Sequence, residues 1–196
     1  MFFPSSEIEV AAILSEAKEP LSVAGGNTRV LAPSGSKIIS TSKLSGVIDY
    51  EPGALTMIAK AGTPLSEIQK TLTSEGQCLA FDPYNWSRFI NKKGSSTIGG
   101  VFAANVSGSS RLRVGAARDF LLGIRLVDGL GNIIQNGGRV MKNVTGYDLV
   151  KLFAGSWGTL GILTEVSFKV LPKPETEATI VIHGLNDQLA LDAMID

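Results

Sequence analysis

The sequence predicts a mixed α/β fold, in which the larger part of the chain forms a mostly antiparallel sheet with flanking helices. Three observations lead to this prediction. Residues 6–50 follow the order helix, strand, loop, strand, strand. Residues 120–127 and 132–135 are strand-like and flank Asp128-Gly129, a dipeptide typical of antiparallel hairpins. Residues 162–171 alternate apolar and polar side chains, as a half-buried antiparallel strand does.

The first element is predicted to be an amphipathic helix over residues 6–18. Ser6 and Glu9 have the spacing of a capping box, and Pro20 stops the helix. One buried stripe is expected along it, formed by Val10, Ile13, Leu14 and Ala17. Short strands are then predicted at residues 21–24, 37–41 and 46–50.

A strand over residues 55–61 and a second helix are predicted next. Thr63 is expected to cap this helix, with Pro64 at its first position and Gly76 at its end. Its inner face is predicted to comprise Leu65, Ile68 and Leu72.

The second half of the chain contributes the hairpin, a short helix over residues 147–154 ended by Gly155, and the alternating strand. Pro172 and Pro174 are predicted to end the domain. A new strand at residues 178–182 and a helix after Asn186 are expected beyond them.

Composition excludes several classes of function. Lys plus Arg and Asp plus Glu both total 18, so no excess positive charge points to nucleic acid. One cysteine and one histidine cannot build a typical zinc or non-haem iron site. The chain has no run of about 20 apolar residues that would span a bilayer and no signal peptide pattern. We therefore expect a cytoplasmic protein without direct membrane insertion.

Three glycine-rich segments carry the candidate chemistry: residues 24–29, residues 95–108 and residues 155–162. Glycines let successive backbone N–H groups approach an anion such as a diphosphate. Tight turns and close packing of small residues are the alternative explanations. No Rossmann fingerprint is present, because the glycines of residues 155–162 precede a strand instead of following one. No Walker loop is present either, because residues 92–96 lack the leading glycine and have their basic pair on the wrong side.

In this order and spacing, the three segments resemble the FAD-binding domain of the vanillyl-alcohol oxidase and p-cresol methylhydroxylase superfamily. Residues 137–172 resemble the smaller FAD-binding subunit of bacterial glycolate oxidase, above all in the segment Val140-Met141-Lys142-Asn143-Val144-Thr145-Gly146-Tyr147-Asp148-Leu149. Residues 97–119 fit the same group, and the likeness extends over residues 6–174.

The resemblance implies a two-lobe FAD-binding domain over residues 1–174, with a small α/β lobe at 1–52 and a larger lobe at 53–174. Residues 175–196 would begin a C-terminal cap region that is truncated or missing. FAD would lie between the lobes. The implied contacts are Ala24, Gly25, Gly26, Asn27 and Thr28 around the diphosphate, Thr97, Ile98, Gly99, Gly100, Ala104, Asn105, Ser107 and Gly108 along the phosphates and flavin, and Gly158, Gly161 and Ile162 at the adenosine side.

The family sometimes tethers FAD through histidine or cysteine. The first loop here has Asn27 and no histidine, and Cys78 is interpreted as an apolar filler. Non-covalent FAD is therefore expected. Gly26→Val is predicted to abolish FAD binding by blocking the approach of the backbone, while leaving the fold largely intact.

The implied function is hydride transfer from a small 2-hydroxy acid such as glycolate to FAD. The implied partners are a second FAD subunit and an iron–sulfur subunit, which would bring the protein to the inner face of the cytoplasmic membrane. A non-catalytic FAD-binding electron-transfer or structural subunit, and an FAD oxidase domain for another alcohol, are the alternatives.

No catalytic residue is identified from the sequence. Weaker candidates are the basic residues Lys92, Lys93, Arg111, Arg113 and Arg118, which could neutralise a diphosphate or a carboxylate or face solvent, together with Lys142, Tyr147 and His183.

Overall fold

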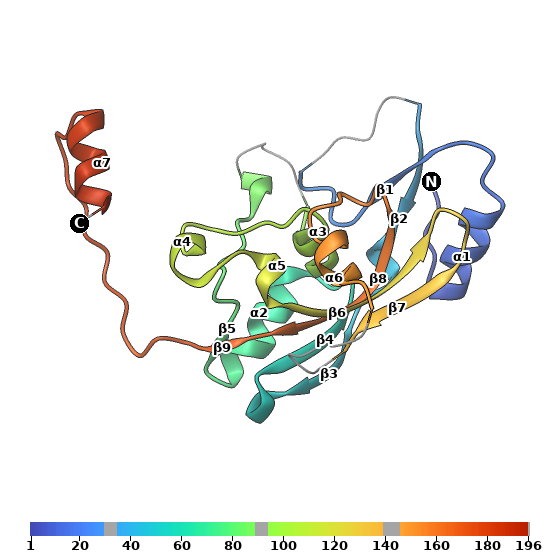
Figure 1. Ribbon diagram of the computed structural model, residues 1–196, viewed down its shortest axis with the longest axis horizontal. Helices are drawn as coiled ribbons and strands as arrows, with labels where there is room; N and C mark the ends of the chain where they lie inside the picture. The colour runs from blue at the N-terminus through green and yellow to red at the C-terminus, as the bar shows by residue number, and fades with distance from the viewer. Residues whose placement is uncertain (30–34, 89–93, 139–145, 196) are drawn as a thin grey trace.

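The computed structural model describes residues 1–29, 35–88, 94–138 and 146–195, and its main feature is a five-stranded antiparallel sheet (Figure 1). The strand order is β3-β4-β8-β6-β7. The bounds are β3 Val47–Glu51, β4 Thr56–Lys60, β6 Leu121–Asp128, β7 Ile133–Gly137 and β8 Gly161–Lys169. These strands match the predicted segments to within a few residues, so the mixed fold with a mostly antiparallel sheet is confirmed.

A second, two-stranded sheet pairs β1 (Leu21–Ala24) with β2 (Lys37–Ser40) in parallel. Phe2 extends it by an isolated bridge to Ile39. Helix α1 (Glu7–Ser15) packs against β6. Val10 of α1 and Ile39 of β2 share a small core with Leu44, Val127 and Ile162, which holds this sheet against the end of β6 and the start of β8.

The main core lies between the larger sheet and helices α2 (Leu65–Ser74), α3 (Ile98–Ala103), α5 (Ala117–Phe120) and α6 (Leu149–Phe153). Phe81, Phe102, Phe120 and Phe168 meet there, with ring centroids 5.2 to 5.8 Å apart. The predicted inner face of α2 is buried as expected. Remaining elements are short: β5 Gln77–Cys78, α4 Arg111–Val114 and β9 Leu171–Pro172.

The burial of β8 differs from the half-buried pattern expected from its alternation. Seven of its nine residues are buried, because β8 is the central strand of the sheet, between β4 and β6. The register against β6 also shifts, since Arg125 pairs with Glu165 but Leu126 pairs with Leu163. This irregularity at Thr164 lets Leu163 join Val166 and Phe168 in the main core while Ile162 faces the smaller one.

Two predicted caps need correction. The Ser6 hydroxyl does accept from the Glu9 N–H at 3.2 Å, but the Glu9 carboxylate binds Ser5 and not Ser6, so only half of the capping box forms. The α1 helix also ends at Ser15, earlier than predicted. Pro64, and not Thr63, occupies the N-cap of α2.

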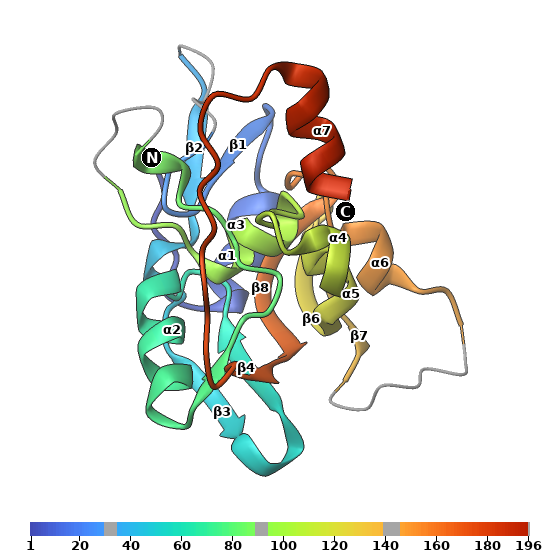
Figure 2. The same ribbon diagram turned by 90° about the vertical axis from the view of Figure 1, so that its left-hand side faces the viewer.

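Beyond Pro172 the chain runs as an extended segment to α7 (Asp187–Ile195), which Figures 1 and 2 show beside no strand. The predicted helix after Asn186 is confirmed. The predicted strand at residues 178–182 is wrong, since Ile180 and Val181 are 86% and 67% exposed and no described strand pairs with them. The division at residues 52 and 174 stays a prediction.

Candidate functional site

The three glycine-rich segments line one cavity, which is open to solvent and lies between the two-stranded sheet, α3 and the start of β8. Its lining residues are Val23, Ala24, Gly25, Gly26, Asn27, Thr28, Arg29, Thr41, Thr97, Gly99, Gly100, Ala103, Ala104, Ser156, Trp157, Gly158, Gly161, Ile162 and Leu163. Twelve of the sixteen predicted contacts are in this set.

The first loop leaves β1 and lies directly against residues 95–97. A Cβ on Gly26 would be 1.6 Å from the Ser95 carbonyl oxygen, and one on Gly25 would be 2.5 Å from Thr97 Oγ1. The Thr28 and Ser96 hydroxyls share a buried hydrogen bond of 3.1 Å. Gly26 is therefore required by packing between two protein segments. The expectation that Gly26→Val spares the fold is wrong, because the side chain would collide with backbone.

Helix α3 forms the floor of the cavity. Thr97 is its N-cap, and its hydroxyl accepts from the Gly100 N–H at 3.3 Å. A Cβ on Gly99 would be 2.5 Å from Ala61 Cβ, so this glycine lets α3 sit directly on the chain that follows β4. Ile98, in contrast, is fully buried in the main core and does not line the cavity.

The third glycine-rich segment, residues 155–162, forms another wall of the cavity. Trp157 has a left-handed backbone with φ of 57°, and its N–H donates to Ala103 O at 2.9 Å. Gly158 has φ of 78°, and a Cβ there would be 3.4 Å from Val23 of β1. A Cβ on Gly161 would lie 2.7 Å from Val127 O. This turn therefore connects α3, β1 and β6 around the cavity.

Among the described residues that line the cavity, Arg29 alone has a charged side chain, and the sequence prediction missed it. Its Nη1 donates to Gly100 O at 3.1 Å, whereas Nε and Nη2 are buried and have no hydrogen-bond partner among the described residues. Burial lowers the pKa of its guanidinium to about 10. The available signal was an arginine at the end of a glycine loop, which is ambiguous because most arginines reach solvent.

Asn105, Ser107 and Gly108, which were also predicted contacts, do not line the cavity. The Asn105 side-chain oxygen accepts from Arg118 N at 2.9 Å, and the Ser107 hydroxyl accepts from Ala117 N at 2.9 Å. A Cβ on Gly108 would be 2.3 Å from Asp82 O. These residues therefore hold the loop that leads into α5 against α5 itself and against the Asp82 backbone.

The weaker candidates lie elsewhere. Arg111, Arg113 and Arg118 are exposed and do not line the cavity, and Asp119 accepts from Ala116 N at 2.8 Å. Tyr147 is 89% exposed, and His183 lies in the exposed segment after β9. Lys92, Lys93, Lys142 and the Val140–Thr145 part of the family-like segment fall outside the described residues.

In the part of the chain that the structure describes, no three His, Cys, Asp or Glu side chains are grouped as metal ligands. Over the same residues, no helix has the length and hydropathy needed to cross a bilayer. Burial raises the pKa of the Cys78 thiol, whose sulfur lies 3.9 Å from Pro172 O.

Known proteins are similar to this chain in sequence and in fold. The model of a family described as an FAD binding domain matches residues 1–137. The chain is 38% identical over 165 residues to glycolate oxidase subunit GlcE of Escherichia coli (strain K12), covering 83% of this chain and 45% of that protein. It is 32% identical over 200 residues to glycolate oxidase subunit GlcD of Bacillus subtilis (strain 168), covering 98% of this chain and 41% of that protein.

The chain thus spans less than half the length of these relatives. Among solved structures, an alkyldihydroxyacetonephosphate synthase superposes with a TM-score of 0.66 at 23% identity, covering 89% of this chain and 32% of that one. This likeness supports the fold described above.

Proposed function

We propose, from the premise that this chain belongs to the FAD-binding domain family, that its cavity binds FAD non-covalently as part of a flavin oxidoreductase for small 2-hydroxy acids. The observation that carries the proposal is the meeting of three glycine-rich segments, more than 130 residues apart at their extremes, around one cavity.

The residues present fit such a cofactor. FAD combines a doubly charged diphosphate with two flat ring systems. The first loop and α3 offer hydroxyls at Thr28 and Thr97, and Arg29 offers two buried nitrogens, Nε and Nη2, whose N–H groups lack acceptors among the described residues. Phosphate oxygens are suitable acceptors for a guanidinium. Trp157 and the small residues of α3 provide apolar walls against which a ring can lie.

When bound, FAD would supply the chemistry by accepting a hydride from the α-carbon of the hydroxy acid. The chain itself would bind and orient the cofactor and keep water from one side of it. Oxidation of a hydroxyl group also needs a proton acceptor. The described wall consists of glycine, alanine and other apolar residues, hydroxyl residues, Asn27 and Arg29, so in this proposal the acceptor comes from another segment or subunit.

Partners follow from the relatives. Two of them are named as subunits of glycolate oxidase, so we propose that this chain works in an assembly with a second FAD subunit and an iron–sulfur subunit. The substrate class would be glycolate-like 2-hydroxy acids, and the assembly would face the cytoplasm at the inner membrane. A non-catalytic FAD-binding subunit is the second candidate, favoured by the composition of the cavity wall.

The test is the visible absorption spectrum of the purified chain before and after acid precipitation. We expect flavin absorbance that moves entirely to the supernatant. Flavin that stays with the precipitate would contradict non-covalent binding, and a colourless chain that takes up no added FAD would contradict the cofactor. Bleaching of the bound flavin by glycolate or D-lactate would favour the enzyme, whereas a stable oxidised spectrum would favour the non-catalytic subunit.

A further inference from the structure

The Arg29 side chain is half-buried, and its Nε and Nη2 atoms are fully buried. Among the described residues the ion pairs are Lys37–Glu19 and Arg125–Glu7, so no described carboxylate lies within ion-pair distance of the Arg29 guanidinium. Two of its three nitrogens are buried without a partner. A buried charge with open donors costs free energy, which proteins normally offset with an anion.

The position of these nitrogens indicates where the anion belongs. Arg29 lines the same cavity as Thr97 and Gly100, and its Nη1 is held by the Gly100 carbonyl. A Cβ placed on Gly100 would be 3.8 Å from Nη1 and 3.1 Å from Thr97 Oγ1. The guanidinium therefore lies beside the N-terminal turn of α3, with Nε and Nη2 left for a ligand.

We propose that Arg29 is the positive counter-charge for a phosphate oxygen of the bound dinucleotide. Without a ligand, the unpaired Arg29 guanidinium destabilises the chain. The inference deepens the proposed function and rests on it for the identity of the ligand. A phosphate is favoured over a single carboxylate, because the surrounding loops offer further hydroxyl and backbone donors for several oxygens.

This arrangement predicts opposite effects of one substitution on stability and on binding. Arg29→Met keeps an apolar side chain of similar reach and removes the charge. The Gly100 carbonyl keeps a partner, because Ala104 N donates to it at 3.2 Å. The empty variant should therefore melt at a higher temperature than the empty wild type. Its affinity for FAD should fall about 10- to 100-fold, the usual effect of losing a charge-assisted hydrogen bond.

The experiment uses the full chain stripped of ligands, in low-salt buffer without multivalent anions. Melting temperatures and calorimetric titrations are measured with FAD, inorganic pyrophosphate, glycolate and D-lactate. Arg29→Lys is included because it keeps the charge with a single nitrogen, and it should retain part of the affinity. Arg113→Met is the matched control, since Arg113 is exposed and lies outside the cavity.

We expect pyrophosphate to raise the melting temperature of the wild type and of Arg113→Met but not of Arg29→Met. Unchanged FAD affinity in Arg29→Met would overturn the inference while leaving the proposed function standing. Protection by pyrophosphate that depends on Arg29, without any FAD binding, would support the anion site and contradict the FAD proposal. Protection by glycolate or D-lactate in place of pyrophosphate would overturn the phosphate assignment. A lower melting temperature for empty Arg29→Met would overturn the claim that the cation destabilises the empty chain.

Discussion

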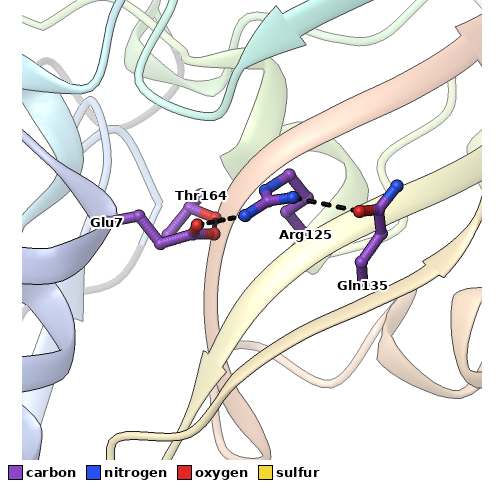
Figure 3. Close-up of polar contacts among 4 residues, drawn as sticks. All are labelled: Glu7, Arg125, Gln135 and Thr164. Atoms are coloured by element: carbon purple, nitrogen blue, oxygen red, sulfur yellow. Dashed lines mark hydrogen bonds and ion pairs between the residues drawn. The ribbon is translucent and has the colours of Figure 1, made fainter.

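Glu7 and Arg125 connect α1 to the larger sheet, and breaking this link should destabilise the chain measurably. Glu7 Oε2 and Arg125 Nη2 are 2.5 Å apart, and Thr164 Oγ1 donates to Glu7 Oε1 at 2.6 Å (Figure 3). Arg125 Nη1 donates to the Gln135 side chain at 3.0 Å. One carboxylate thus binds two strands of the sheet, next to the small core that α1 shares with Ile162.

The burial of the pair sets the size of the effect. The Arg125 and Glu7 side chains are 34% and 18% exposed, between the surface and buried cases. Exposed pairs contribute about 0–1 kcal/mol, whereas breaking a buried pair costs about 3–5 kcal/mol. We expect Glu7→Gln or Arg125→Met to lower the free energy of unfolding by roughly 1–3 kcal/mol. For a chain of this size that lowers the melting temperature by about 3–9 °C.

The assay is urea unfolding of the wild type, both single variants and the double variant. The coupling energy from this cycle should be about 1 kcal/mol or more. The matched control is the Lys37–Glu19 pair, whose N–O distance of 3.0 Å is also short but whose side chains are 58% and 65% exposed. A Glu7–Arg125 coupling no larger than that of the control, within about 0.3 kcal/mol, would refute the reasoning.

Three further predictions concern single residues. Burial raises the pKa of the Glu165 carboxyl, so the folded chain holds this proton more tightly than the unfolded chain, whose pKa is about 4.3. The free energy of unfolding therefore falls as pH rises from the unfolded pKa through the folded pKa. Across this window Glu165→Gln should become more stable relative to the wild type. Urea midpoints of the two proteins that change in parallel from pH 4 to 7 would contradict this prediction. Thr63→Val should cost about 1–3 kcal/mol of unfolding free energy, because the buried hydroxyl accepts from Gly46 N at 2.9 Å, while Thr63→Ser should retain most of the stability. Gly99→Ala should destabilise by about 1–3 kcal/mol through its collision with Ala61, whereas Gly53→Ala, which meets nothing within 4 Å, should melt like the wild type.

Local patterns predicted the elements well where a single strand or helix explains the pattern. The strand at Leu21–Ala24 was predicted to the residue, and Leu65, Ile68 and Leu72 are buried as their spacing indicated. Errors arose where burial or bonding depends on distant partners. Thr63 looked like a helix cap, but it binds the chain before β3.

The candidate site likewise combines features that local sequence patterns predicted with features that depend on distant partners. Most of its glycine-rich backbone was predicted as ligand contacts, but Asn105, Ser107 and Gly108 turned out to contact α5 and the Asp82 backbone. A short polar residue near a glycine has the same sequence pattern whether it faces a ligand or another loop. The contacts with FAD themselves stay predictions.

The sequence by itself determined the mixed fold, most of its strands and the family, since these depend on periodicity and on motifs read along the chain. Only the tertiary structure decided which segments face one cavity and which pack on each other. Gly26 must be glycine because of Ser95, and Arg29 stands out because its nitrogens are buried without acceptors. Such facts depend on contacts between residues some 70 positions apart, and no local pattern encodes the distance between them.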